Sequence, residues 1–331
     1  MNPRLNIKKD TKIYVACPAN VATGGPELLH QFAFKLKKNN LNVFIFYTNR
    51  TGKDPVHNNY REYAIEWVEE IKDDVHNILI VPEVETNFIL NYNKIQKVIW
   101  WLSIDFYFLS LPGIVGKLNR ILLHKFNIQT YFGFNKRLKN IDLHMVQSKY
   151  AETFLKSKKI DNLIYMSDYL HKNFIDIETK LALKENIVAY NPKKGIKFTT
   201  ELMQAASDIR FVAIENMRRE EVVQLLQKAK VYVDFGFHPG KDRIPREAAI
   251  LKCCVITNKK GSANFFEDLP INNEYKFYDK TSSINGIKKT IQECFFKYDE
   301  KINHFKQYVD EIQNQEKQFD NEIKEFIKLS Y

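Results

Sequence analysis

Two glycines stand beside a proline and a glutamate where a helix is expected to follow a strand. Residues 12–18 (KIYVACP) predict a buried strand, and apolar residues at helical spacing begin soon after Gly24-Gly25-Pro26-Glu27. Glycine permits close backbone approach, and a helix N-terminus presents free N–H groups with a partial positive charge. The stretch fits a diphosphate site, or only a tight turn in which Glu27 satisfies the helix dipole. The G-x-G-x-x-G fingerprint is absent, which argues against a conventional dinucleotide site.

A pair of lysines follows a second apolar segment. Lys193 and Lys194 belong to the stretch 191–195 (NPKKG), directly after the strand pattern NIVAY. Their ammonium groups could hold the phosphates of a departing nucleoside diphosphate. A turn with two solvated lysines explains the same residues equally well.

The stretch 235–257 is the richest in candidate functional residues. A strand ends near Phe235, and a helix is expected to start near Pro245, with Glu247 in its first turn. The polar residues of interest are His238, Lys241, Asp242, Arg243, Arg246 and Glu247. Cations at a helix N-terminus need a balancing anion. Arg243 or Lys241 could grip phosphate while Glu247 accepts from a ribose diol, although Glu247 could instead serve only the helix dipole.

The sequence supports neither kinase chemistry nor a metal site of the Asp-x-Asp type. The triplet Asp234-Phe235-Gly236 matches a kinase motif, but no other kinase signature accompanies it, so we interpret it as a coincidence at a strand end. No Asp-x-Asp triplet occurs, and we predict no metal site and no cofactor.

Activation of an acceptor hydroxyl needs a general base within hydrogen-bond reach. The candidates are Asp105 after WWLSI, Glu83 in VPEV, and His30, each of which also has a purely structural explanation. Trp100 and Trp101 could stack on an acceptor sugar, or pack in the core.

The elements that must position these residues alternate between strand and helix, which predicts parallel α/β sheets. Strand patterns occur at 12–18, 41–49, 77–84, 97–105, 143–149, 186–195, 209–216, 231–237 and 253–258. We expect two Rossmann-like, doubly wound domains facing across a ligand cleft. Their predicted bounds are 1–168 for the acceptor-side domain, 169–185 for a linker, 186–285 for the nucleotide-sugar domain, and 286–331 for C-terminal helices.

Composition indicates a soluble globular protein, with 44% hydrophobic and 27% charged residues and a net charge of +10. The four cysteines form no Cys-x-x-Cys pair and are predicted to be small buried residues of a reducing compartment. No signal peptide is evident. Asp105 and Pro112 interrupt the apolar stretch 98–116, so we reject a membrane span. We expect a cytoplasmic protein whose loop 106–115 is a candidate for peripheral contact with the inner face of the cytoplasmic membrane.

Three segments resemble bacterial glycosyltransferases of the glycosyltransferase-B fold. Residues 24–46 are similar to the first glycine loop and helix of those enzymes, and 186–195 to the opening of their donor-binding domain. Residues 220–257 are similar to their helix, strand, loop and Glu-Ala signature. The resemblance implies metal-independent sugar transfer from a nucleotide donor held mainly by the C-terminal domain. The last helices would brace the two domains.

The resemblance also implies roles for single residues. Glu247 would bind the donor ribose or a neighbouring group, and Gly24-Gly25 would close over the diphosphate or sugar. The phosphate grip would be Lys193, Lys194 and Arg243. Two departures stand out. The glutamate usual upstream of the Glu-Ala motif is missing, so that His238 or Asp242 would have to replace it, and Lys252 stands where the family has glycine.

The sequence therefore predicts a glycosyltransferase that moves a sugar to a glycan or lipid-linked acceptor in surface polysaccharide synthesis. Retention or inversion stays open because of the missing glutamate. A nucleotide-sugar epimerase of the same fold, a basic nucleic-acid-binding protein and a catalytically inactive scaffold are the alternatives. The lysines are spread along the chain without a recognition motif, so we expect no nucleic-acid partner.

Overall fold

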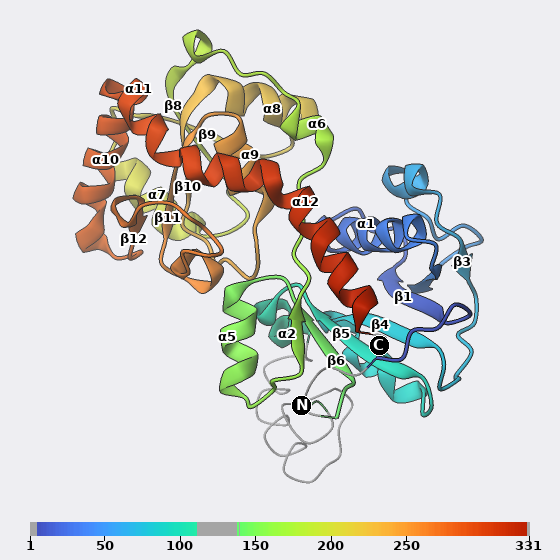
Figure 1. Cartoon of the computed structure of the whole chain (residues 1–331). Coiled ribbons are helices and arrows are strands. Elements are labelled where there is room, and N and C mark those ends of the chain that lie inside the picture. The colour runs from blue at the N-terminus through green and yellow to red at the C-terminus, as the bar shows by residue number, and fades with distance from the viewer. Residues whose placement is uncertain (1–4, 111–137, 139, 330–331) are drawn as a thin grey trace. The chain divides into compact units, whose positions relative to one another are not determined.

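The computed structural model describes residues 5–110, 138 and 140–329, and the chain divides into two compact units (Figure 1). The first unit contains the described residues up to Asp168 together with those from Lys317 onward. The second unit runs from Tyr169 to Glu316. The last helix, α12 (Lys306–Lys328), therefore begins in the second unit and ends in the first.

The first unit is built on a parallel sheet of seven strands in the order β3-β2-β1-β4-β5-β6-β7. The strands are β1 (Lys12–Pro18), β2 (Asn42–Thr48), β3 (Trp67–Val68), β4 (Ile78–Pro82), β5 (Gln96–Trp101), β6 (Leu143–Val146) and β7 (Leu163–Tyr165). The helical elements are α1 (Gly24–Lys38), η1 (Asn58–Tyr63), η2 (Glu83–Asn91), α2 (Ile104–Ser110) and α5 (Lys149–Ser157). The strand order reverses between β1 and β4, and ligands of open parallel sheets bind at the carboxyl ends of strands beside such a reversal.

The second unit has a parallel sheet of five strands in the order β12-β11-β10-β8-β9. Its strands are β8 (Glu185–Tyr190), β9 (Arg210–Ala213), β10 (Ala229–Asp234), β11 (Cys254–Asn258) and β12 (Lys276–Phe277). The helices are α6 (Lys172–Ile175), α7 (Ile196–Ala205), α8 (Arg219–Lys228), α9 (Arg243–Ile250), α10 (Ile284–Phe296) and α11 (Tyr298–Lys301), with short turns η3 (Leu181–Leu183), η4 (Gly261–Asn264), η5 (Asn273–Tyr275), η6 (Thr281–Ser283) and η7 (Ile302–Phe305). In this sheet the order reverses between β8 and β10.

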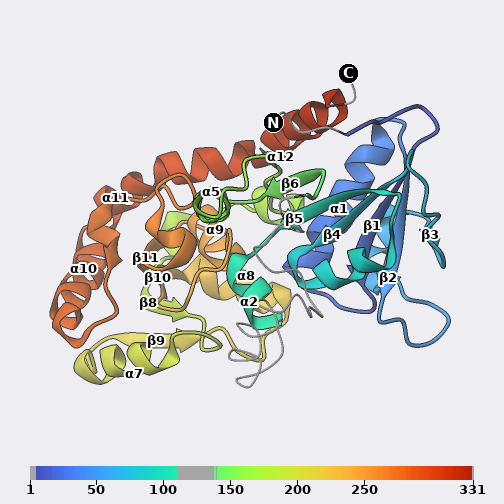
Figure 2. The same cartoon turned by 90° about the horizontal axis from the view of Figure 1, so that it is seen from below.

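The two parallel α/β sheets and the C-terminal run α10, α11 and α12 (orange to red in Figure 2) confirm the predicted fold class. The central strands read as continuous apolar runs because both faces of a parallel sheet are covered. In β4, for example, every residue is buried.

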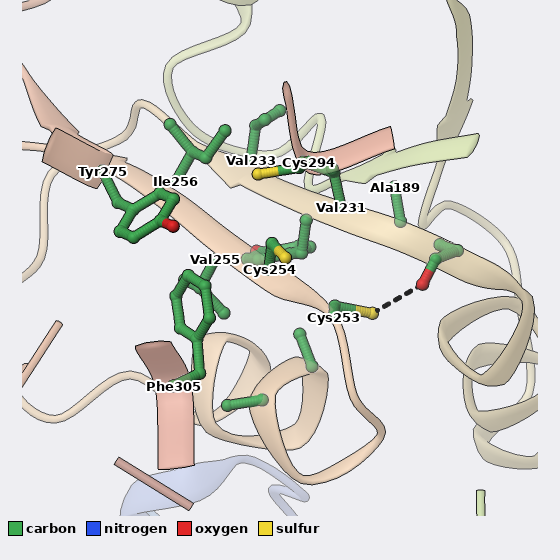
Figure 3. Close-up of a cluster of buried hydrophobic side chains, with 14 of the residues drawn as sticks. Ala189, Val231, Val233, Cys253, Cys254, Val255, Ile256, Tyr275, Cys294 and Phe305 are labelled. Atoms are coloured by element: carbon green, nitrogen blue, oxygen red, sulfur yellow. Dashed lines mark hydrogen bonds between the residues drawn. The ribbon is translucent and has the colours of Figure 1, made fainter. Parts of the chain in front are cut away.

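The core of the second unit surrounds β10 and β11, where Figure 3 shows the cysteines Cys253, Cys254 and Cys294 among aliphatic and aromatic side chains. All four cysteines of the chain are buried and free, as the sequence predicted. The Cys253 thiol donates to the carbonyl oxygen of Ala229 at 3.1 Å. These cysteines therefore serve as small core residues.

A lysine fastens the start of the second sheet to the ends of two helices. The Lys184 ammonium donates to the carbonyl oxygens of Leu226, Ala229 and Leu251 at 2.6–2.8 Å. Leu226 lies in the last turn of α8 and Leu251 is the C-cap of α9. A cation is favourable at both helix C-termini because their last carbonyls lack intrahelical partners.

The segment predicted as a linker, 169–185, is not isolated from the second unit. Leu170 and Phe174 are buried in its hydrophobic core. At the other end of the chain, Glu322 of α12 accepts from the backbone N–H and the hydroxyl of Ser167 at 2.6 and 2.7 Å, within the first unit. Phe326 packs edge-on against Phe32 of α1.

Candidate functional site

The loops after β8 and β10 touch at the reversal of strand order in the second sheet. Gly195, at the end of the first loop, has φ +66°. A Cβ there would lie 2.4 Å from the carbonyl carbon and oxygen of Phe235, in the second loop. Only glycine therefore allows these two loops to come so close.

A buried ion network joins the same two loops. The Lys194 ammonium lies 3.1 Å from a carboxylate oxygen of Asp234 and 2.5 Å from one of Asp242. Asp242 also hydrogen-bonds Nδ1 of His238 at 2.7 Å. His238 is 1% exposed and Asp234 3% exposed, so the network is largely shielded from water. Asp242 thus contacts both Lys194 and His238, two of the other predicted site residues.

Opposite effects determine the pKa values in this network. Burial alone would lower the pKa of Lys194, but the charges of Asp234 and Asp242 outweigh it and raise that pKa. Burial alone would raise the pKa of Asp242, but the hydrogen bond from His238 and the charge of Lys194 hold it below its ordinary value. The lysine is therefore held as an ammonium ion and Asp242 as a carboxylate.

Asp234 is a functional candidate that the sequence analysis set aside as a coincidence. Its Oδ1 accepts from the N–H of Gly236 at 3.0 Å, and its Oδ2 accepts from the hydroxyl of Tyr232 at 3.1 Å. With Lys194 it ties together the end of β10 and both loops. The available signal was a carboxylate at the carboxyl end of a buried strand next to a glycine.

A third loop, after β11, was also missed. The N–H of Ser262 donates to the carbonyl of His238 at 2.9 Å, and the Ser262 hydroxyl donates to the carbonyl of Gly240 at 2.6 Å. Gly261 has φ +53°, and a Cβ there would lie 2.0 Å from the carbonyl oxygen of His238. The glycine in NKKGSAN was the sequence signal for this close approach.

Helix α9 starts earlier than predicted. It begins at Arg243 with Asp242 as N-cap residue, so Glu247 is the fifth helical residue and lies beyond the first turn. The buried Arg246 donates to the carbonyl oxygens of Lys241 and Asp242 at 2.9 and 3.2 Å. Arg246 therefore holds the loop in place.

The other residues predicted to bind the donor are more accessible to solvent. Lys193 is exposed, whereas Lys241, Arg243 and Glu247 are half-buried. Three side chains of the network, Asp234, His238 and Asp242, have the atom types and the spacing to ligate a metal ion. The ammonium of Lys194 already supplies a positive charge to both of these carboxylates.

In the first unit, Gly24 and Gly25 form the start of α1, after the N-cap residue Thr23. Pro26 is thus the third helical residue and not the first. A Cβ at Gly25 would meet Leu102 at 3.6 Å, which is an ordinary contact. Packing against the residues that the structure describes therefore does not explain this glycine.

Glu83 and Asp105 follow neighbouring strands of the first sheet. Glu83 comes directly after β4, is buried, and accepts from the N–H of Leu102 at 3.0 Å. Burial raises its pKa to about 8. Asp105 lies in the first turn of α2 and not at a strand end. Burial raises its pKa too, against the hydrogen bond from the Tyr150 hydroxyl at 3.3 Å. Both carboxyl groups are stronger bases than a solvated carboxylate.

The structure argues against His30 as the general base. It is 1% exposed, and its ring stacks on Tyr60 with 4.3 Å between centroids. Its Nδ1 hydrogen-bonds the carbonyl of Pro26 at 2.6 Å, and its Nε2 the hydroxyl of Tyr47 at 2.7 Å. Because both nitrogens are engaged inside the protein, neither is placed to take a proton from an acceptor.

The prediction that Trp100 and Trp101 stack on an acceptor sugar is also corrected. Both are 0% exposed. Their indole N–H groups donate to the carbonyl of Met166 and to Nδ1 of His144, each at 3.0 Å. Both rings are core residues, and neither presents a face to a ligand.

The apolar segment proposed for membrane contact is described only in part. Phe106 and Leu109 of α2 are 46% and 67% exposed, while residues 111–115 lie outside the described residues. Among the described residues, no helix has both the length and the apolar character needed to cross a bilayer.

Solved structures share this fold along almost the whole chain. Sucrose-phosphate synthase from Thermosynechococcus elongatus has a TM-score of 0.65 at 13% identity, covering 96% of this chain and 98% of that one. HepE from Anabaena in complex with UDP and glucose has a TM-score of 0.64 at 11% identity, covering 96% and 99%. A glycosyltransferase from Rickettsia africae has a TM-score of 0.60 at 11% identity, covering 97% of both chains.

No family model matches the chain, and no curated protein sequence matches it significantly. At this level of identity the solved structures define the fold alone. That fold is the glycosyltransferase-B fold, with two parallel α/β sheets followed by C-terminal helices.

Proposed function

We propose that the protein is a glycosyltransferase that takes a sugar from a nucleotide-diphosphate donor bound by the second unit. The observation that carries the proposal is the site at the β8–β10 reversal of strand order, where three loops are fixed around a buried ion network. Ligands of open parallel sheets bind at such reversals. Proteins of the same fold include HepE, whose structure contains UDP and glucose.

The donor-side residues divide into a framework and a binding group. Lys194, Asp242 and His238 hold the loops, as their mutual contacts indicate. Lys193, Lys241 and Arg243 would neutralise the diphosphate, and Glu247 would accept hydrogen bonds from the ribose. Such cations stabilise the charge that develops on a leaving diphosphate, so the proposed reaction needs no metal ion. Gly24 and Gly25 would approach the diphosphate or sugar.

For the acceptor step we propose a carboxylate of the first unit as the general base. The raised pKa of Asp105 makes its carboxylate a stronger base than a solvated one. Glu83, whose pKa is about 8, would act as a base only in the fraction that is ionised. Asp105 is the more accessible of the two, since Glu83 is 3% exposed. We further propose a glycan or lipid-linked acceptor of surface polysaccharide synthesis, with the exposed end of α2 in peripheral contact with the inner face of the cytoplasmic membrane.

A thermal-shift screen against UDP, GDP, ADP, CMP and dTDP tests the proposal, beginning with UDP. A ligand at a hundred times its dissociation constant stabilises a protein by about 2.7 kcal/mol, which raises the melting temperature measurably. We expect one nucleotide to stabilise the protein, and Glu247→Ala to abolish the effect. Glu220→Ala, which changes an exposed glutamate on α8, is the matched control and should keep it.

The outcomes separate the alternatives. Stabilisation by no nucleotide would contradict the proposal, and a steep fall of nucleic-acid affinity with salt would then favour a nucleic-acid-binding protein. Conversion of the donor sugar without any acceptor would identify an epimerase. Nucleotide binding without turnover of any donor would indicate an inactive scaffold.

A further inference from the structure

The network in the second unit resembles a cation site in its donor atoms. Asp234, His238 and Asp242 each offer one ligand atom, and these three atoms lie within 4.8 Å of one another. Carboxylate oxygens and an imidazole nitrogen form a common ligand set for divalent ions such as Mn²⁺ and Zn²⁺. We call these three side chains the carboxylate cage.

The Lys194 ammonium contacts the two carboxylates of this set. Its three N–H groups have three oxygen acceptors: Asp242 at 2.5 Å, Asp234 at 3.1 Å and the carbonyl of Phe237 at 3.3 Å. An ammonium group has no further proton to donate. The side chain of Lys194 is 14% exposed. In this arrangement Lys194 cannot also grip a phosphate.

The neighbouring residue, Lys193, differs from Lys194 in its exposure and in its ion pairing. Lys193 is exposed, and no ion pair of its side chain is found within the part of the chain that the structure describes. Its backbone N–H donates to the side chain of Asn191 at 3.0 Å, so that the turn itself is fixed while the ammonium reaches into solvent.

We propose that Lys194 is the built-in cation of the carboxylate cage, in the place that a divalent ion would otherwise take, and that Lys193 is left to meet an incoming anion. Lys194 is then a positioning residue, which joins the loops after β8 and β10 before any ligand arrives. Removing it would leave the buried carboxylate of Asp234 and the partly buried carboxylate of Asp242 without their lysine counter-charge, which is unfavourable. The cage part of this proposal does not depend on the proposed function.

Amine labelling of the unmodified protein tests the first part. Reductive methylation at neutral pH, followed by tandem mass spectrometry, gives separate rates for Lys193 and Lys194. Only an accessible amine that is free of its hydrogen-bond partners reacts, and the Lys194 ammonium is shielded and held by three oxygen acceptors. We expect Lys193 to be labelled several-fold faster than Lys194. Equal rates would overturn the proposal.

A metal-substitution experiment tests the cage itself. We expect Lys194→Ala to bind Mn²⁺, seen as loss of the free-ion signal in electron paramagnetic resonance, and to melt at a higher temperature when Mn²⁺ is added. The wild-type protein and the matched control Lys193→Ala should show neither effect. Mn²⁺ binding by the wild type that Asp242→Asn removes would overturn the proposal, as would a folded Lys194→Ala protein that binds no Mn²⁺.

A second variant covers the case in which Lys194→Ala does not fold. In the double variant Lys194→Ala/Asp234→Asn the buried carboxylate is gone, and only the partly buried carboxylate of Asp242 lacks the lysine counter-charge. We expect it to be more stable than Lys194→Ala alone, and a double variant that is no more stable would contradict the role of Lys194 as counter-charge.

The role of Lys193 is tested by labelling in the presence of UDP, and this arm rests on the proposed function. Protection of Lys193 alone is the expected result. Protection of Lys194 would show that it leaves the cage for the phosphate, which would refute the division between the two lysines while supporting nucleotide binding. Protection of neither lysine would count against Lys193 as the anion-binding group. The proposed function as a whole would fail only if the nucleotide screen were negative too.

Discussion

The replacement Gly195→Ala tests whether the close approach of the loops after β8 and β10 matters for both folding and ligand binding. Gly195 has φ +66°, and a Cβ would lie 2.4 Å from the carbonyl of Phe235 and 2.5 Å from the N–H nitrogen of Gly236. Atoms at that separation overlap strongly. The loop after β8 must therefore move away from the loop after β10.

The magnitude has two parts. A non-glycine residue in the left-handed region costs about 1–2 kcal/mol. Overpacking a tight contact costs a further 1–3 kcal/mol or so. We expect a total loss of about 2–5 kcal/mol in the unfolding free energy of the second unit. The control is Gly52→Ala, where φ is +87° but nothing lies within 4 Å of the added Cβ, so that only the backbone cost applies.

The distribution of tryptophan makes the assay specific for each unit. The three tryptophans, Trp67, Trp100 and Trp101, all lie in the first unit. In urea, tryptophan fluorescence therefore follows the first unit, while far-UV circular dichroism follows both. Gly195→Ala should shift a dichroism transition and leave the fluorescence transition in place, and Gly52→Ala should shift the fluorescence transition. Stabilisation by UDP should be lost only in Gly195→Ala.

Two results would refute this reasoning. One is a Gly195→Ala protein whose loss of stability is no larger than that of Gly52→Ala. The other is a Gly195→Ala protein with the full loss of stability but an unchanged response to UDP, because the displaced loop would then have no part in binding.

Three further predictions concern single contacts. The pKa of Glu83 is about 8 in the fold against 4.5 in the unfolded chain, so the folded state binds more protons between these pH values, and the free energy of unfolding falls as pH rises through that window. Glu83→Gln should remove this fall of several kcal/mol, at about 1.4 kcal/mol per pKa unit. Equal pH profiles of the fluorescence transition in the wild type and the variant would contradict the prediction. Lys184→Met should cost about 1–3 kcal/mol in the dichroism transition because three carbonyl groups lose the ammonium donor, and only those of Leu226 and Ala229 keep the weaker Cys253 thiol; a neutral effect would show that water replaces the ammonium. Lys252 has φ +62°, so Lys252→Gly should raise the melting temperature by relieving up to about 1–2 kcal/mol of backbone strain, and a lower melting temperature would contradict that assignment.

Much of the fold was accessible from the sequence because both faces of its central strands are buried. Runs such as KIYVACP and NILIVP are then almost continuously apolar, and glycine or polar residues mark their ends. The short edge strands β3, β7 and β12 were not predicted. They have only two or three residues each, too few for any periodicity, and they form because a longer strand beside them offers free hydrogen-bonding groups.

The location of the site could be predicted from the sequence, but not which lysine forms ion pairs with the carboxylates. The sequence shows that lysines and carboxylates follow β8 and β10, yet it cannot show which of Lys193 and Lys194 turns inward. Steric contacts between loops more than forty residues apart decide this, since Gly236 packs against the side chain of Lys194. Trp100 and Trp101 failed for a related reason, because an aromatic residue at a strand end has the same sequence signature whether it packs inward or faces a ligand.

Lys252 shows that a lysine can take a backbone conformation that favours glycine. The resemblance described above implies a glycine at this position, and here the lysine adopts the left-handed conformation that glycine takes without strain. The turn into β11 thus has the backbone conformation that favours glycine, although a lysine stands there. A departure from a family pattern therefore does not by itself indicate a change of local structure.

The charge balance of the loops after β8 and β10 is a second argument for an anion-binding site there. Residues 191–195 and 234–247 contain five lysine or arginine side chains and three carboxylates, which leaves an excess of two positive charges. The ion network uses one lysine for two carboxylates, so the excess resides on the other basic side chains, of which Arg246 is buried against backbone carbonyls. The side chains of these two segments outside the network therefore sum to a net positive charge, although acidic groups of other segments, such as Asp268 in the same pocket as Lys241, offset part of it. We propose that an anionic ligand at this edge of the sheet gains from the remaining excess, and a diphosphate has the matching sign of charge.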